Sequence, residues 1–252
     1  MGESFGAYSL DGDDAVIGSV SSVNIACGFH AGDPHVMGLT VRLAKEHGVG
    51  IGAHPGLPDL LGFGRRDMAC SPEEIADYLT YQIGALQAFC IAQGVALRHV
   101  KPHGALYNRA ANDERLVRVM AQAVARIDRS LFLVGLAGRK NHRMAAIAAE
   151  AGVNMVFEAF PDRAYTPEGT LVARNLSDAV ILDPETAAAR AVRMAIDRTV
   201  EAVDGTVVPL TAQTLCIHGD HPQGAFLAVA IRERLEAAGV AVRPMQPVCD
   251  VP

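Results

Sequence analysis

The sequence has 252 residues, of which 50% are hydrophobic and 20% are charged. This balance excludes a disordered chain and allows one domain with a large core, because (β/α) barrels reach this length as a single unit. The formal net charge is −6 at pH 7, and no run of Lys or Arg is present. We therefore do not expect a nucleic acid or an acidic membrane surface as a partner. A small molecule or another protein is the expected partner.

Cysteine usage and the ends of the chain indicate a cytoplasmic protein. The five cysteines are widely spaced and form no Cys-x-x-Cys pair, which is typical of reduced thiols. The first residues have neither the basic nor the apolar region of a signal peptide, and no apolar run reaches the roughly 18 residues of a membrane helix. We therefore expect neither secretion nor a membrane segment.

Segments with strand character alternate with longer segments of helical character. In the first half, we expect a helical turn at 15–19 and strands at 22–27, 49–53 and 97–101. Asp33 followed by Pro34 predicts the start of a helix that runs to residue 46, because Asp caps helices and Pro suits their first position. Ser71, Pro72 and Glu74 form a capping-box signature for a second helix to residue 93. A long loop, 55–69, lies between these helices.

The second half continues the alternation. We expect strands at 131–136, 154–158, 180–182, 214–218 and 240–243, and helices at 113–126, 139–151, 184–200 and 224–238. Strands separated by helices of this length predict a parallel sheet built from about seven βα units. Since no linker interrupts residues 1–252, a single α/β domain is expected. Polar loops follow nearly every strand, which favours a closed or nearly closed TIM-like barrel over an open doubly wound sheet.

Three histidines follow three successive predicted strands: His30, His54 and His103. The carboxyl ends of parallel strands share one face, where ligands bind, so these side chains are expected to converge. Imidazoles suit a divalent metal, with Asp33 or Asp220 supplying an oxygen. Histidines that hydrogen-bond a substrate directly are the alternative, and the spacing leaves both open.

Lys101 and His103 are two residues apart, so both point to the same side of an extended strand. Burial in apolar surroundings would lower the pKa of Lys101, which suits a general base or a partner for a negative group. We take Lys101, His103 and Asp33 as the candidate catalytic residues. Arg65 and Arg66 lie in a glycine-flanked loop and could clamp a carboxylate or phosphate.

Two nucleotide-binding signatures are absent from the sequence. It contains no G-x-x-x-x-G-K-[ST] phosphate loop and no G-x-G-x-x-G that opens a helix after a strand. Any ATP chemistry must therefore be unconventional or belong to another chain.

Several long motifs carry a family resemblance. They are Gly2-Glu-Ser-Phe-Gly6, Asn24-Ile-Ala-Cys-Gly-Phe-His-Ala-Gly-Asp33, Gly52-Ala-His-Pro-Gly56, Gly62-Phe-Gly-Arg-Arg66, Val100-Lys-Pro-His-Gly-Ala-Leu-Tyr107 and Asp162-Arg-Ala-Tyr165. With these motifs in order, the chain strongly resembles the LamB/YcsF family, the A subunits of bacterial 5-oxoprolinases. The resemblance extends from Gly2 to the stretch 217–220.

The resemblance implies a hydrolase that cleaves the cyclic amide of 5-oxoproline to glutamate, coupled to ATP hydrolysis, in a complex with B and C subunits. It also implies a distorted or incomplete TIM-like barrel similar to carbohydrate deacetylases, whose metal sites use Asp and His at strand ends. On this basis the candidate substrate-binding residues are Asn24, Arg65, Arg66, Asp162, Arg163, Tyr165 and His218. Family members begin with an additional Asp-Leu-Asn-x-Asp strand, so either Met1 is an internal Met and the true start lies upstream, or this chain lacks the first barrel strand, as we expect of the sequence as given.

Two other functions stay open. A metal-dependent deacetylase or amidohydrolase that works alone would also use a barrel mouth rich in histidines. A non-catalytic subunit that binds the lactam would explain why no phosphate loop is present. Besides B and C subunits, a homo-oligomer is a further arrangement that the sequence allows.

Overall fold

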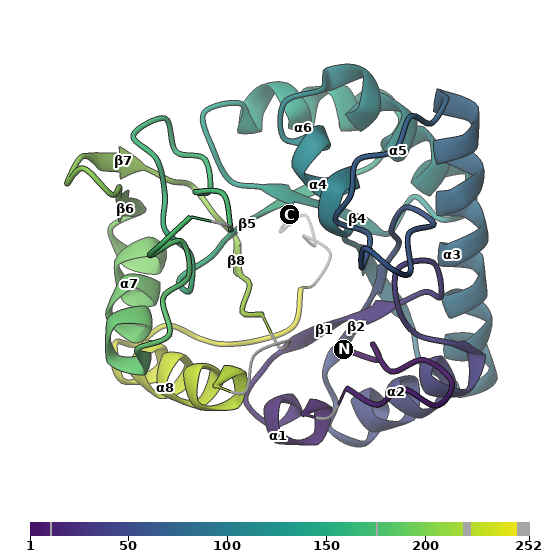
Figure 1. Cartoon of the computed structure of the whole chain (residues 1–252), viewed down its shortest axis with the longest axis horizontal. Helices are drawn as coiled ribbons and strands as arrows, with labels where there is room; N and C mark the ends of the chain where they lie inside the picture. The colour runs from purple at the N-terminus through teal and green to yellow at the C-terminus, as the bar shows by residue number, and fades with distance from the viewer. Residues whose placement is uncertain (11, 175, 219–222, 246–252) are drawn as a thin grey trace, which may run out of the picture.

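The structure, a computed structural model, describes residues 1–10, 12–174, 176–218 and 223–245. Its main sheet contains six parallel strands in chain order: β1 (Ser22–Ala26), β2 (Gly50–His54), β3 (Leu97–Val100), β4 (Phe132–Leu136), β5 (Met155–Ala159) and β8 (Thr214–Leu215). The sheet curls around a central space, with the helices on its outer side (Figure 1). This arrangement confirms the expected α/β, TIM-like and incomplete barrel, in which β1 and β8 are the edges of the described sheet.

Helices precede, connect and follow the strands. They are α1 (Asp13–Ile17), α2 (Pro34–Glu46), α3 (Pro72–Ala92), α4 (Gly104–Ala110), α5 (Glu114–Ile127), α6 (Asn141–Glu150), α7 (Pro184–Ile196) and α8 (Gly224–Ala237). Asp33 caps α2, and the Ser71 and Glu74 capping box starts α3, as their sequence signatures predict. None of the described helices is long and apolar enough to cross a membrane.

Several predicted boundaries differ from the structure. Helix α4 was not expected. The helix predicted at 184–200 ends at Ile196, because Arg198 has a φ of 55° and the next residues form an antiparallel hairpin of β6 (Thr199–Glu201) and β7 (Val207–Pro209). The segment 180–182 contributes one isolated bridge through Val180, and 240–243 is not a strand. Strand β8 is shorter than the predicted 214–218.

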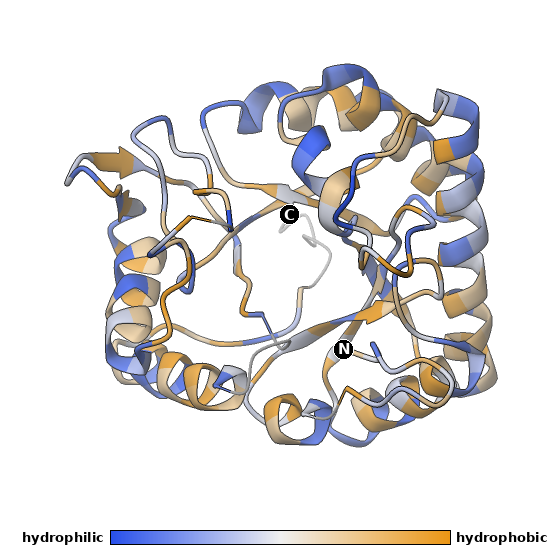
Figure 2. Ribbon diagram, viewed as in Figure 1, coloured by the Kyte–Doolittle hydropathy of each residue, from blue (hydrophilic) through white to orange (hydrophobic). Residues whose placement is uncertain are grey.

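Successive residues of a strand point to opposite faces of the sheet, so the strands place apolar residues on one face and polar residues on the other. Val23 and Ile25 of β1, like Ile51 and Ala53 of β2, belong to the buried core. The long helices carry both hydrophobic and hydrophilic residues, which is typical of helices with one face on a core (Figure 2). The intervening strand residues point to the opposite, inner face of the curled sheet.

On this inner face the parallel register forms a polar row. Asn24 lies beside Gly52, and Gly52 lies beside His99 on the next strand. Two residue pairs further along, Ala26 lies beside His54, close to where the strands end. The carboxyl ends of β1, β2 and β3 therefore bring polar side chains to the same end of the sheet.

Candidate active site

The three histidines predicted to converge do form one cluster. The nitrogen atoms that His30, His54 and His103 could offer to a metal all lie within 4.8 Å of one another. The rings of His30 and His103 are stacked, with centroids 3.8 Å apart, and His54 meets His103 edge-on at 4.8 Å. His30 and His103 are buried and His54 is partly buried at the ends of β1, β2 and β3, so three successive βα units hold the cluster.

Hydrogen bonds fix the protonation of two of these rings. His54 Nδ1 lies 2.6 Å from the Lys101 carbonyl oxygen, and His103 Nε2 lies 2.7 Å from that of Phe63. Because a carbonyl can only accept, each of these nitrogens carries a hydrogen. The remaining nitrogens, His54 Nε2 and His103 Nδ1, face each other at 3.0 Å.

Two neutral imidazoles in this arrangement would direct two lone pairs at each other. Burial lowers the pKa of His103 to about 4 and that of His54 well below its ordinary value, so a bridging proton is disfavoured at neutral pH. A metal ion accepts both lone pairs, and metal-bound histidines commonly donate their other N–H to a backbone carbonyl. Among the described residues, neither ring nitrogen of buried His30 has a hydrogen-bond partner. The cluster therefore fits a divalent metal.

Glycines make room for the histidine cluster. A Cβ atom on Gly64 would lie 2.7 Å from His30 Cβ and 2.8 Å from His103 Cδ2, and Gly64 has a φ of 63°. A Cβ atom on Gly56 would lie 2.7 Å from His30 Nδ1. The buried Gln82 of α3 holds Gly56 by accepting from its N–H and donating to its C=O, both at 2.9 Å.

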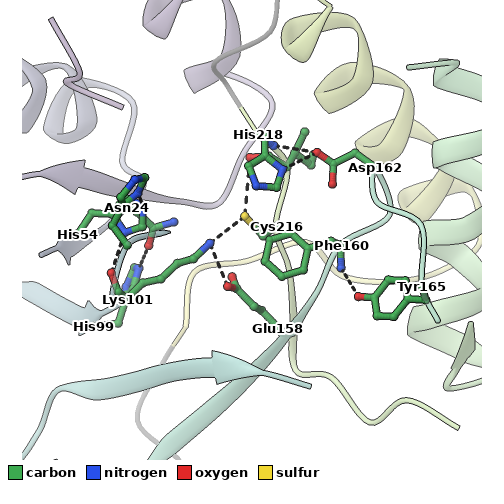
Figure 3. A network of polar contacts seen from close by, with 12 residues as sticks. Asn24, His54, His99, Lys101, Glu158, Phe160, Asp162, Tyr165, Cys216 and His218 are labelled. Atoms are coloured by element: carbon green, nitrogen blue, oxygen red, sulfur yellow. Dashed lines mark hydrogen bonds and ion pairs between the residues drawn. The ribbon is translucent and has the colours of Figure 1, made fainter. Parts of the chain in front are cut away.

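A buried charged network lies beside the cluster (Figure 3). The Lys101 ammonium is 2.9 Å from Glu158 Oε1 and 3.0 Å from Cys216 Sγ. Burial alone would lower the pKa of Lys101, but hydrogen bonds to Cys216 and Glu158 and the charge of the Glu158 carboxylate raise it above its ordinary value. The prediction of a lowered Lys101 pKa is therefore wrong, because a carboxylate partner on β5 offsets desolvation. Lys101 is a cation, suited to holding a negative group.

Aromatic rings and protonated groups surround this cation. The Lys101 ammonium lies 5.6 Å from the Tyr107 ring centroid and 5.1 Å from that of Phe160. Burial raises the pKa of Tyr107 well above its ordinary value and that of Cys216 to about 12. Both groups therefore keep their protons at neutral pH and are available as hydrogen-bond donors.

Asp162 and His218 form a second pair at the mouth. Asp162 Oδ2 accepts from the backbone N–H of His218 at 3.1 Å and lies 2.8 Å from its Nδ1. The His218 ring stacks on Phe160, with centroids 5.4 Å apart. Although burial raises it, the pKa of Asp162 is lowered in total by the hydrogen bonds from His218. Asp162 is therefore a carboxylate.

Other predicted site residues hold backbone or neighbouring side chains. Asn24 Oδ1 accepts from His99 Nε2 at 2.9 Å, which places it on the inner face below the cluster. The buried Arg163 guanidinium donates to the carbonyls of Val172 and Ala179, so it fixes the loop after β5. Tyr165 Oη accepts from the Phe160 N–H at 2.9 Å.

The arginine pair and Asp33 have distinct surroundings. Arg66 forms an ion pair with Asp59, whereas the exposed Arg65 guanidinium lies 5.0 Å from the Phe63 ring centroid. Asp33 accepts from the N–H groups of Gly6 and His35, each at 2.8 Å, and caps α2. Its carboxylate oxygens are thus engaged by backbone. Asp220, the other predicted oxygen ligand, lies outside the described residues.

Comparison with known proteins identifies the family. The model of the LamB/YcsF family matches residues 1–250. This chain belongs to the LamB/YcsF family. It is 53% identical over 243 residues to a protein of Heliobacterium modesticaldum named as the A subunit of 5-oxoprolinase, covering 96% of this chain and 94% of the relative. A protein of the same name from Thermococcus onnurineus is 51% identical, covering 97% of this chain and 95% of the relative.

A solved structure agrees with the assignment to the LamB/YcsF family. The lactam utilization protein of Thermus thermophilus superposes with a TM-score of 0.90 at 50% identity, covering 97% of both chains. A putative cellobiose-phosphate cleavage protein of Enterococcus faecalis has a TM-score of 0.51 at 12% identity, and it shares the fold alone.

Several residues of this LamB/YcsF site were not singled out from the sequence. Glu158 is the one charged residue in the strand Met155–Ala159, and an isolated carboxylate in an apolar strand was the available signal. Cys216 and His218 are two residues apart, as two residues on the same side of a strand are, but this spacing did not indicate that Cys216 contacts Lys101. Tyr107 ends a family motif, which likewise gave no sign of its contact with Lys101. Gln82 lies in an apolar stretch of a long helix, and only the fold reveals its partner Gly56.

Proposed function

We propose that this chain is the A subunit of an ATP-hydrolysing 5-oxoprolinase, a hydrolase that opens the cyclic amide of 5-oxoproline to give L-glutamate. The observation that carries the proposal is identity of about half the residues, over nearly the whole length, with proteins named as A subunits of 5-oxoprolinase. A lactam utilization protein with the same fold supports the same substrate class. The four described cysteines are free thiols, which agrees with a cytoplasmic complex.

In this proposal ATP is bound through the partner B and C subunits, because the sequence has no phosphate loop of its own. The present chain then supplies the lactam site at the carboxyl ends of its strands. Lys101 holds the negative charge that develops on the carbonyl oxygen, since it is a buried cation 2.9 Å from its counter-ion Glu158. Arg65, an exposed residue of the loop that carries Phe63, is the candidate for the substrate carboxylate.

The same proposal assigns a divalent metal to His30, His54 and His103. A bound metal would polarise the lactam carbonyl as a Lewis acid. An all-imidazole ligand set favours Zn²⁺ or a similar transition metal over Mg²⁺, which prefers oxygen ligands. His103 then acts as a ligand, and Asp33 serves to cap α2 beside the site.

The test is reconstitution of the chain with B and C subunits of a LamB/YcsF system. Glutamate and ADP are measured with 5-oxoproline and ATP, and metal content is measured on the same protein. We expect ATP-dependent glutamate from the wild-type complex and from the control His142→Gln, which changes an exposed residue of α6. Lys101→Met and His103→Asn should each lower the rate by at least about 100-fold. Undiminished glutamate formation by both variants would overturn these roles.

Two alternatives predict different results. The three-histidine cluster alone would also serve a metal-dependent amidohydrolase, which should hydrolyse amide or acetyl substrates without ATP or partners. A non-catalytic subunit should bind 5-oxoproline in calorimetry, while its Lys101→Met variant leaves turnover of the complex unchanged. The reconstituted assay therefore separates all three functions.

A further inference from the structure

The Asp162 and His218 pair has the geometry of an oriented base. Asp162 is only 2% exposed, whereas the His218 side chain is 26% exposed at the mouth. The same carboxylate oxygen receives both the backbone N–H and Nδ1 of His218. Two contacts to one oxygen fix the position of the residue and the rotation of its ring.

This contact also selects the tautomer. A carboxylate can only accept, so the hydrogen of a neutral His218 ring lies on Nδ1 and the lone pair lies on Nε2. Stacking on Phe160 at an interplanar angle of 19° holds the ring plane. In this tautomer the partly exposed ring presents the Nε2 lone pair to whatever occupies the mouth.

The Phe160 ring joins this base to the buried cation. The Phe160 ring stacks on the His218 ring, and its centroid also lies 5.1 Å from the Lys101 ammonium. In Figure 3 Lys101 reaches toward Cys216, His218 lies on the other side of Cys216, and Glu158 and Asp162 flank Lys101 and His218 respectively. A base and a cation for a developing oxyanion thus face one site, which is the pairing that amide hydrolysis requires.

We propose that His218 is the general base and acid of lactam ring opening, and that Asp162 is its positioning residue. In the step, His218 Nε2 takes a proton from water as the water oxygen bonds to the lactam carbonyl carbon. The ring C–N bond then breaks, the proton on Nε2 passes to the departing nitrogen, and the proton left on the new carboxyl group moves to the resulting amine. One water is consumed, and the products are a carboxylate and an ammonium group. This role rests on the proposed lactam hydrolase function.

The experiment uses the complex reconstituted with B and C subunits. His218→Gln should lower kcat about 10²–10⁴-fold with KM changed only a few-fold, because a general base acts on the transition state. Asp162→Asn should also lower kcat, since an amide can donate to Nδ1 and thereby leave the hydrogen on Nε2. The His142→Gln control should keep wild-type kcat. Imidazole added to the His218→Gly complex should raise its kcat at least about tenfold over the value without imidazole.

A second measurement needs no variant. Nitrogen NMR of the wild-type chain should show His218 as the Nδ1–H tautomer, and the opposite tautomer would overturn the proposal. Wild-type kcat in the His218→Gln complex would overturn it as well, as would a His218→Gly complex that folds but gains nothing from imidazole. A wild-type complex that forms no glutamate would instead overturn the proposed function, and this role with it. The two failures are therefore distinguishable.

Discussion

Gly64 lies against two of the three clustered histidines and has a φ of 63°. We predict that Gly64→Ala destabilises the fold by about 2–4 kcal/mol, because left-handed strain of about 1 kcal/mol adds to overpacking against His30 and His103. Metal affinity should fall in parallel. Urea unfolding and zinc titration of the purified chain measure both effects.

Gly48 provides the matched control for this change. It has nearly the same φ, 66°, but an added Cβ would meet nothing within 4 Å. Gly48→Ala should therefore cost only the backbone strain, about 1 kcal/mol, and leave zinc binding intact. Equal effects of the two substitutions would show that steric contact with the histidines contributes nothing.

His99 gives the fold a defined sensitivity to acid. Burial, with a contribution from Lys101, lowers its pKa from 6.5 to about 3. Between these two values the unfolded chain binds the proton and the folded chain does not, so stability rises with pH and is lost as pH falls below 6.5. One such group contributes a slope of about 1.4 kcal/mol per pH unit.

The measurement is urea unfolding of the metal-free chain from pH 6.5 to pH 4.5, where carboxylates with lowered pKa values still remain ionised. His99→Gln retains a donor for Asn24 but removes the titration, so its slope should be shallower by about 1.4 kcal/mol per pH unit. The exposed His142→Gln should leave the slope unchanged. Parallel slopes for wild type and His99→Gln would contradict this account.

At the residue scale, sequence patterns predicted some site residues and missed others for a physical reason. His30, His54 and His103 could be predicted to meet because parallel strands end at one face. The charge state of Lys101 could not, since its partner Glu158 lies on β5, and β4 separates the two strands. Local spacing carries no information about which distant carboxylate reaches a given lysine.

At the scale of elements, the Lys101 and Glu158 ion pair connects β3 to β5 across the inner face. Both side chains are buried, so removal of one charge leaves the other unpaired. We predict that Lys101→Met costs about 3–5 kcal/mol, and that the double variant Lys101→Met with Glu158→Gln recovers at least half of this loss. A double-mutant cycle in urea measures the coupling. Additive losses would show that the two charges do not depend on each other.

Long, capped elements followed from the sequence more reliably than short ones. Helix α3 begins where its capping box predicts, because the side chains of Ser71 and Glu74 accept hydrogen bonds from backbone N–H groups at the helix start and need no distant partner. The seven-residue α4 and the three-residue strands of the β6 and β7 hairpin were missed. A seven-residue helix has fewer than two turns and a three-residue strand has fewer than two alternations, so neither is long enough to establish a hydrophobic pattern, and tertiary contacts decide them.

At the scale of the whole molecule, a bound metal should stabilise the fold by mass action. With Zn²⁺ at about 100 times its dissociation constant, the gain is about 2.7 kcal/mol, or about 5–10 °C in the melting temperature of a chain of this size. His30→Phe keeps a ring at a position without hydrogen bonds and removes one ligand, so its melting temperature should respond less to Zn²⁺. Calorimetric scans of both proteins, with Zn²⁺ and with a chelator, measure these changes in melting temperature. No shift for the wild type would contradict a metal site in the cluster.

The mouth of the barrel is assembled from both ends of the chain. The histidine cluster is complete once residue 103 is in place, whereas Cys216, the partner of Lys101, lies 115 residues further along the chain. Proteins are synthesised from the amino terminus, and early segments can fold before later ones exist. On the ribosome, His30, His54 and His103 can therefore gather while Asp162 and His218 are still to be made. A nascent chain of this kind holds its complete histidine cluster long before its Asp162 and His218 pair exists.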